Sequence, residues 1–263
     1  MAYETILVEP PAEGVLTVTL NRPEQLNTFN MAMMRDFRAL WADVREDPGV
    51  RAIVLRAAGE RAFCAGIEAG GGFRDGQARS RERPFELGDP GEWLGPKQNK
   101  VWKPVICAVH GICAGGAFYF LNESDIAICA DDATFFDPHI SHAMTPCVEP
   151  VGLLARLPLA EVQRLALMGA DERIGAATAL RISLVTEVTP RAALWDRAQE
   201  IAVSIARKHP VAVQGGVRAV WEALSLPHAQ AVANALKYGL IGNAVTRADK
   251  DFKPPEKVKP RVR

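Results

Sequence analysis

The sequence has no excess of either charge: its 263 residues include 31 lysines and arginines against 31 aspartates and glutamates. A chain without an excess of basic residues lacks the overall positive electrostatic potential that attracts proteins to nucleic acids. It also has no uninterrupted apolar run near the ~20 residues of a membrane-spanning helix, and its first residues lack the basic and apolar segments of a signal peptide. We therefore expect a protein that binds neither nucleic acid nor a membrane and is not exported.

Cysteine is scarce, and its arrangement argues against two further classes. There are five cysteines, with no C-x-x-C pair and no grouping with the five histidines: Cys64, Cys107, Cys113, Cys129 and Cys147. An odd number of cysteines, mostly within apolar runs, does not suggest a disulfide framework, and the spacing is not that of metal ligands. We expect reduced thiols, a cytoplasmic location and no bound metal.

The remaining composition, 48% hydrophobic and 24% charged residues, is that of an ordinary globular chain able to bury one sizeable core. Residues 15–20 alternate as in a strand, 31–45 carry apolar residues at helical spacing, and 52–57 form a buried-strand pattern. Helical patterns dominate the last third, at 159–168, 191–208, 211–223 and 228–239. The order of these patterns predicts an α/β fold.

Two glycine turns are the most informative feature. The first, Cys-Ala-Gly-Gly-Ala-Phe at 113–118, lies between a strand-like and a helix-like run, and the second, Phe-Cys-Ala-Gly-Ile at 63–67, follows the strand at 52–57. A helix opening at Gly116 presents unpaired N–H groups and a positive dipole end. A lone glycine pair more often serves close helix packing, but two such turns can converge on one carbonyl oxygen.

Several segments together resemble the crotonase superfamily, the enoyl-CoA hydratases and isomerases. They follow the family order over most of the chain: residues 20–27, 62–66, 104–116, 124–130 and 133–136. The resemblance implies a crotonase-like spiral of repeated strand-strand-helix units with a CoA-ester site over residues 1–190, and a C-terminal helical trimerisation region over 191–250. We expect residues 251–263, which are basic and proline-rich, to form a flexible tail.

The resemblance also implies which groups act. The N–H groups of Ile67 and Gly116 would form an oxyanion hole for a thioester carbonyl, and the adenine of coenzyme A would lie beside the backbone from Ala65 to Ile67. The substrate would be an acyl-CoA, with no cofactor required beyond the CoA that it carries. A homotrimer or a dimer of trimers is expected. The long segment 70–95, rich in Gly, Arg, Glu and Pro, is expected to cover the acyl chain.

The chain departs from the hydratases at both positions where they carry a catalytic glutamate. Three residues beyond the oxyanion glycine it has Tyr119, and after the proline of residues 135–139 it has His139. A histidine with a pKa near ~6.5 can act as acid or base at neutral pH, whereas a tyrosine near ~10 is a poor base. We expect His139 to be the acid/base, with a turn histidine as the alternative. Tyr119 either assists or is a core aromatic.

Two further candidates follow the histidine. Glu149 brings a carboxylate close to the expected acyl pocket, where it would orient His139 and raise its basicity, or else complement a helix dipole from the first turn. Cys147 would be a nucleophile if a histidine activated it, but a buried inert thiol is the favoured interpretation.

Three functions therefore remain open. The first is an enoyl-CoA hydratase or isomerase, a lyase or isomerase whose acid/base work has moved to His139. The second is an enzyme using the same oxyanion hole for other acyl-CoA chemistry or for hydrolysis of a β-dicarbonyl carbon–carbon bond. The third is a non-catalytic acyl-CoA binder. Both glycine turns are retained, which favours an enzyme.

Overall fold

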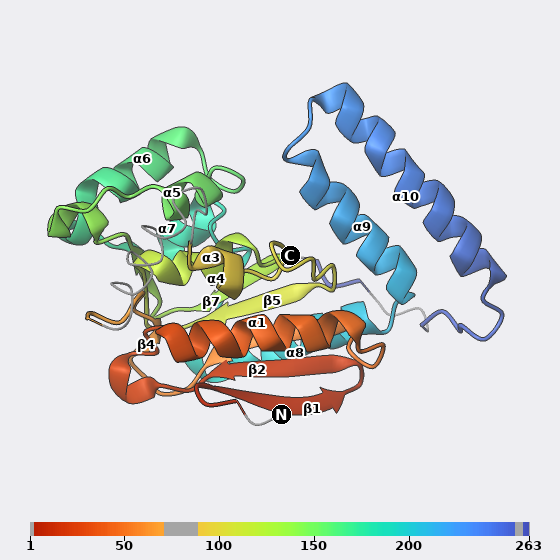
Figure 1. Cartoon of the computed structure of the whole chain (residues 1–263), viewed down its shortest axis with the longest axis horizontal. Coiled ribbons are helices and arrows are strands. Elements are labelled where there is room, and N and C mark those ends of the chain that lie inside the picture. The colour runs from red at the N-terminus through yellow and green to blue at the C-terminus, as the bar shows by residue number, and fades with distance from the viewer. Residues whose placement is uncertain (1–2, 71–88, 256–259, 263) are drawn as a thin grey trace, which may run out of the picture.

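The computed structural model describes residues 3–70, 89–255 and 260–262, and its strands form two sheets (Figure 1). In the larger sheet β1 is antiparallel to β2 and all other neighbours are parallel. Its order is β1 (Ile6–Ala12), β2 (Val15–Leu20), β3 (Ala52–Ala57), β5 (Val105–Val109), β7 (Ile126–Ala130) and β10 (Glu187–Thr189). The smaller sheet has the order β4 (Ala62–Cys64), β6 (Ile112–Ala114), β8 (Thr134–Phe136) and β9 (Ile174–Gly175).

Each turn of the chain places one strand in the larger sheet and the next in the smaller one. β3 is followed by β4, β5 by β6 and β7 by β8, and β4, β6 and β8 pair in parallel. A helix completes the unit, as α4 (Phe118–Asn122) does after β6 and α5 (Val148–Leu153) after β8. The predicted α/β spiral of strand-strand-helix units is confirmed.

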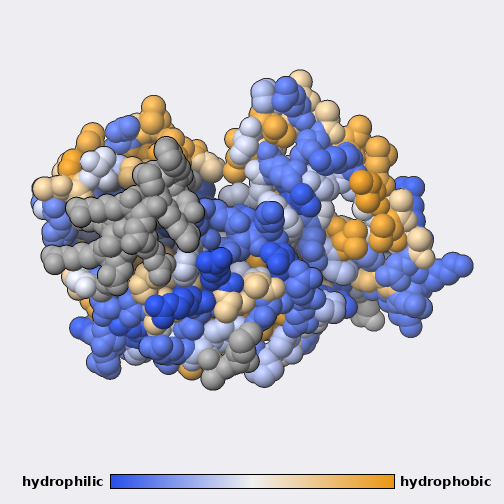
Figure 2. All heavy atoms as spheres, viewed as in Figure 1, coloured by the Kyte–Doolittle hydropathy of each residue, from blue (hydrophilic) through white to orange (hydrophobic). Residues whose placement is uncertain are grey.

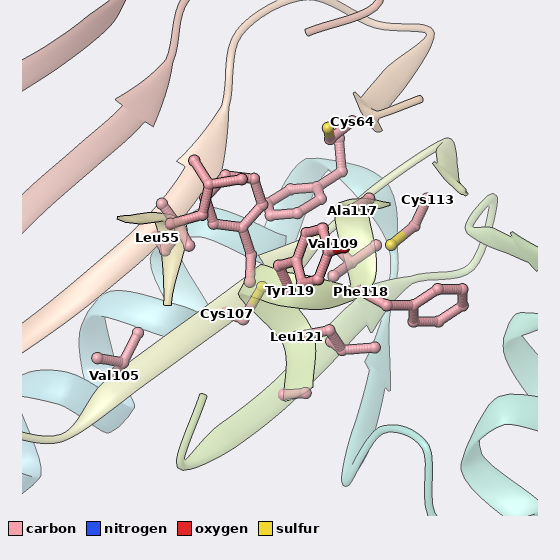
Figure 3. Packing of buried hydrophobic residues seen from close by; sticks show 14 of the residues in the cluster. Leu55, Cys64, Val105, Cys107, Val109, Cys113, Ala117, Phe118, Tyr119 and Leu121 are labelled. Atoms are coloured by element: carbon pink, nitrogen blue, oxygen red, sulfur yellow. The ribbon is translucent and has the colours of Figure 1, made fainter. Parts of the chain in front are cut away.

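The larger sheet is the central layer because both of its faces are apolar. Along β3, Ile53 and Leu55 belong to one buried cluster and Ala52 and Val54 to the other. Helix α1 (Met31–Glu46) packs in the first cluster and α8 (Leu194–Ala206) in the second, on opposite sides of the sheet (Figure 1). Figure 3 shows how α4 joins the first cluster.

Helix α1 forms where the spacing of apolar residues predicts it. Its buried side chains recur every three or four residues: Met33, Met34, Phe37, Leu40, Trp41 and Val44. Asn30 caps it by accepting the N–H of Met33 at 3.1 Å. Trp41 also donates its indole N–H to the carbonyl of Leu94 at 3.0 Å, which fixes the short helix α3 (Gly91–Leu94) on α1.

The C-terminal helices divide into two groups. Helices α6 (Leu159–Met168) and α7 (Ala176–Arg181) lie near the smaller sheet, whereas α9 (Pro210–Ala223) and α10 (His228–Ala248) form an antiparallel pair, the helical arm, that projects beyond the sheets (Figure 1). Helix α10 was expected to end at residue 239 but continues to Ala248, because a glycine weakens a helix by only about 1 kcal/mol and no proline follows before Asp249. No described helix combines the length and apolarity needed to cross a bilayer.

Candidate active site

The two glycine turns meet at one edge of the smaller sheet. β4 and β6 pair in parallel, with Cys64 opposite Cys113, so the turns that follow them leave the same edge. Gly66 has a φ of +95°, and a Cβ placed on it would lie 3.0 Å from the carbonyl oxygen of Ala114 and 3.4 Å from the nitrogen of Gly116. A side chain at position 66 would therefore separate the two turns.

Within the described part of the chain, the N–H groups of Ile67 and Gly116 both lie outside the surrounding backbone pairing. In the bridge between Phe29 and Ile67, the N–H of Phe29 donates to Gly66 at 2.9 Å and the N–H of Glu68 donates to Phe29 at 2.9 Å, so the Ile67 N–H is not used. Gly116 lies in the short 3-10 turn Gly115–Ala117 that opens α4, where the first N–H groups have no partner within the helix.

His139 follows β8, the next strand of the same sheet, and Asp137 holds its ring. Asp137 is completely buried, and its Oδ1 accepts the backbone N–H of His139 at 3.1 Å and also contacts Nδ1 of the ring. A Cβ placed on Gly115 would lie 3.7 Å from Cε1 of His139, so the imidazole is beside the glycine turn. The predicted histidine is thus adjacent to the Gly116 turn.

The contact with Asp137 affects both the pKa of His139 and the ring nitrogen that is left free. The hydrogen bond to Asp137 raises the pKa of His139, with burial opposing it and the Asp137 and Glu149 charges adding to it. With Nδ1 directed at the carboxylate, Nε2 is the nitrogen that remains for a substrate. Nε2 lies 3.8 Å from Oε1 of Glu149, too far for a direct hydrogen bond.

Glu149, in the first turn of α5, is 4% exposed, and burial raises its pKa. Tyr119, on α4, is also buried, and its hydroxyl donates to Oδ2 of Asp89 at 3.1 Å. Burial, followed by the charges of Glu149 and Asp89, raises the pKa of Tyr119 far above its ordinary value. The phenol is therefore neutral at physiological pH and cannot serve as a base.

The predicted site residues fall into two groups. Gly116 lies beside Tyr119, whose Cε2 would be 3.2 Å from a Cβ placed on the glycine, and His139 lies beside Glu149. Cys147 lies outside this group and is exposed. The expectation that Cys147 is buried was wrong, because it precedes α5 at the rim of an apolar cavity of about 670 Å³. Ala65 and Ile67 are half-buried in the turn after β4, and the N–H of Ala65 donates to Leu26 at 3.0 Å.

Sequence reasoning missed two residues of the site, Asp137 and Asp89. Asp137 could have been found from the sequence, because an aspartate two residues before a histidine in a turn can accept hydrogen bonds from both the backbone N–H and the ring of that histidine. No sequence pattern points to Asp89, because it lies in a segment without periodicity. Residues 71–88 of that segment are outside the described part of the chain. Only the fold brings Asp89 to Tyr119, 30 residues further along.

Asp137, His139 and Glu149 also offer three ligand atoms within 4.8 Å of one another. One oxygen of Asp137 is already engaged by Nδ1 of the ring, which leaves Nε2 of His139 and Glu149 on the open side. Catalytic zinc sites generally use three protein ligands. The arrangement fits a histidine oriented by a buried carboxylate better than a metal centre.

Two known hydratases are similar to this chain in sequence. The chain is 34% identical over 207 residues to the (E)-benzylidenesuccinyl-CoA hydratase of Thauera aromatica, covering 76% of each chain. It is 30% identical over 220 residues to the short-chain-enoyl-CoA hydratase of Clostridium acetobutylicum, covering 84% of this chain and 82% of that one.

A solved structure has the same fold. The enoyl-CoA hydratase/isomerase from Mycobacterium paratuberculosis superposes with a TM-score of 0.82 at 31% identity, over 94% of this chain and 92% of the other. Residues 11–238 also match the sequence model of a family described as Enoyl-CoA hydratase/isomerase. The resemblance seen in the sequence is thereby confirmed, and the chain belongs to the enoyl-CoA hydratase/isomerase family of the crotonase superfamily.

Proposed function

We propose that the protein is an enzyme that acts on an acyl-CoA thioester, with the N–H groups of Ile67 and Gly116 as its oxyanion hole and His139 as its acid/base. The observation that carries the proposal is the Asp137–His139 pair beside the glycine turn. The hydratase names of the relatives support CoA-ester chemistry. The backbone from Ala65 to Ile67 is the proposed contact for the adenine of coenzyme A.

For hydration of an enoyl thioester we assign the roles as follows. Nε2 of His139 takes a proton from water as the oxygen bonds to the β-carbon. The negative charge that develops on the thioester oxygen is stabilised by the two N–H groups. Glu149, whose pKa is raised by burial, delivers a proton to the α-carbon, and solvent exchange returns both groups to their starting states.

Crotonyl-CoA tests this proposal directly. We expect the purified protein to consume its enoyl absorbance at neutral pH and to bind the saturated analogue butyryl-CoA. Binding without turnover would reject hydration of this ester and leave the other two functions: different chemistry behind the same oxyanion hole, or a non-catalytic acyl-CoA binder. Failure to bind either ester would contradict the acyl-CoA site itself.

A second candidate function is hydrolysis of a β-dicarbonyl carbon–carbon bond. It is favoured by one observation, the buried Asp137 that orients the imidazole, because such a pair is suited to activate water for attack on a carbonyl. Release of acid from a cyclic 1,3-diketone, with no loss of absorbance from crotonyl-CoA, would identify this activity in place of hydration.

Asp137→Asn is expected to move the acidic limb of the pH–rate profile to lower pH by about one unit. The base must be neutral to act, and the bond to Asp137 raises the pKa of His139, so activity in the native protein is lost as pH falls through that raised value. Loss of the carboxylate lowers the pKa. A profile of kcat/KM with crotonyl-CoA measures the shift, and an unchanged limb would remove Asp137 from this role.

We infer that the helical arm makes contacts between copies in a homotrimer or a dimer of trimers. The arm exposes large apolar side chains, visible as an orange area in Figure 2: Val220, Leu224, Val232, Leu236, Leu240, Ile241 and Val245. A surface of this kind is typical of an interface. The mass in solution tests the inference, and a monomer would contradict it.

The predicted division of the chain at residue 190 also stays a proposal, although α8, which lies beyond that residue, packs on the larger sheet.

A further inference from the structure

Tyr119 fills the space between the Gly116 turn and helix α3. A Cβ placed on Gly116 would lie 3.2 Å from Cε2 of its ring, and a Cβ placed on Gly91, the first residue of α3, would lie 2.9 Å from Cδ1. Both glycines therefore let the ring approach the backbone more closely than a residue with a side chain would. Tyr119 is only 8% exposed, so these contacts, and not solvent, determine where its ring lies.

The hydroxyl group ties this ring to the rest of the fold. It donates to Oδ2 of Asp89 at 3.1 Å, and Oδ1 of Asp89 accepts the N–H of Gly91 at 2.8 Å. The carboxylate thus binds the tyrosine with one oxygen and α3 with the other. Helix α3 is held in turn by the fully buried Trp41, which donates to the carbonyl of Leu94. The phenol is therefore connected through Asp89 and α3 to the core helix α1.

Helix α4, which carries Tyr119, is too short to fix the Gly116 turn by itself. It has five residues, Phe118–Asn122, and no described side chain caps it or the 3-10 turn that opens it. A helix of this length is unstable without contacts to other parts of the fold. The direction of the Gly116 N–H therefore depends on the side chains packed around the turn, and Tyr119 is one of them.

Phe29 extends these contacts to the second glycine turn. Its ring would lie 2.6 Å from a Cβ placed on Gly116, and it meets the Tyr119 ring at a centroid distance of 6.1 Å and an interplanar angle of 64°. The backbone of Phe29 forms the bridge with Ile67. A displacement of the Tyr119 ring would therefore reach both N–H groups, which must converge on one oxygen to stabilise it.

We propose that Tyr119 is a positioning residue for the Gly116 N–H, and that Asp89 holds the Tyr119 ring in place for this role. The use of that N–H as an oxyanion donor rests on the proposed function, whereas the anchoring of the turn does not. A donor of this kind is effective when it is preorganised, with its N–H already directed at the position where charge develops. Neither side chain has to touch the substrate.

Tyr119→Phe tests the anchor, because it removes the hydroxyl and keeps the ring. The first measurement is ¹⁵N relaxation of the Gly116 amide in the ligand-free protein, assigned by its absence in Gly116→Pro. We expect the order parameter of this amide to fall from about 0.85, typical of a rigid backbone, toward about 0.6. Ser124→Ala is the matched control, since the Ser124 hydroxyl donates to the carbonyl of Phe120 at 2.7 Å at the other end of α4. It should leave the Gly116 amide unchanged.

The second measurement is the infrared carbonyl band of bound butyryl-CoA, labelled with ¹³C at the thioester carbon. Hydrogen bonds to a carbonyl oxygen lower its stretching frequency, so the band reports on the donors without turnover. In Tyr119→Phe we expect the band to return part of the way to its position in the free ester. With crotonyl-CoA we expect kcat to fall about tenfold, less than for a deleted donor, and KM to stay within about two-fold.

Asp89→Ala separates the anchoring of Tyr119 from the contact with α3. If Asp89 acts through the phenol, its loss should loosen the Gly116 amide as Tyr119→Phe does and should add little in the Tyr119→Phe background. An effect through the Gly91 N–H alone would be equal in both backgrounds. An unchanged amide in Tyr119→Phe, or an Asp89→Ala effect that persists in full without the hydroxyl, would overturn the proposal.

The relaxation measurement needs no ligand, so it stands apart from the proposed reaction. If the amide loosens as expected while the native protein does not bind butyryl-CoA, the anchoring of the turn holds and the acyl-CoA function fails. If butyryl-CoA binds and its carbonyl band is shifted in the native protein but equally shifted in Tyr119→Phe, the acyl-CoA site holds and the positioning role of Tyr119 is rejected.

Discussion

Replacing His139 by alanine is expected to abolish measurable turnover while acyl-CoA affinity stays within a few-fold. The imidazole is the group on the open side of the site that can take a proton from water, and loss of a general acid/base typically costs roughly 10²–10⁴ in rate. Affinity should persist because the proposed CoA contacts are backbone groups at Ala65 and Ile67. Crotonyl-CoA turnover and butyryl-CoA binding measure the two effects separately.

His142 offers a matched control, because it belongs to the same short turn, His139–His142, but is exposed. His142→Ala removes an imidazole from the same element and should leave the rate unchanged. Full activity in His139→Ala with the true substrate would show that another group is the base. Equal losses in both variants would indicate that the turn itself had been disturbed.

Replacing Gly116 by proline is expected to lower the rate by roughly 10²–10³ through loss of one oxyanion donor. Proline has no N–H, but any residue with a Cβ at this position also meets Phe29, whose Cε1 and Cζ would lie 2.6 Å away. A loss of rate in the proline variant alone therefore mixes two causes. Phe29 is buried, so its ring cannot simply swing into solvent.

Gly116→Ala in a Phe29→Leu background separates the two causes. The alanine keeps the N–H, and the smaller leucine relieves the contact, so this pair should recover much of the rate. Gly116→Pro in the same background should remain slow. If both double variants had equal rates while folded, judged by near-ultraviolet circular dichroism, the Gly116 N–H would have no part in the reaction.

Much of the fold follows from periodicity in the sequence. Strand β3 and helix α6 occupy the expected residues, since apolar spacing reports which face an element buries. The end of α10 was misplaced because a glycine lowers helix propensity without breaking the helix. The repeated strand-strand-helix unit came from the resemblance, but the partition of consecutive strands between two sheets was not predicted, because local pattern carries no information on which sheet a strand joins.

The candidate site was predictable only in part. The resemblance directed attention to positions 119 and 139, and a carboxylate at position 149 was a reasonable partner. The hydrogen bond from Tyr119 to Asp89 was not predictable, because its two ends are 30 residues apart and one lies in a segment without a pattern. Side-chain contacts of this kind depend on how elements pack, which the order of residue types does not reveal.

The smaller sheet has a consequence for how such a protein can diversify. β4, β6 and β8 deliver the Ile67 turn, the Gly116 turn and the His139 turn to one edge, with Ala114 opposite Phe136 in the last pair. The strands carry the apolar residues of the core, and the reactive groups sit just beyond their ends. The residues that would carry out the reaction and the residues that stabilise the fold therefore occupy different positions. Substitutions in the turns can change the acid and the base while the core of the fold stays the same.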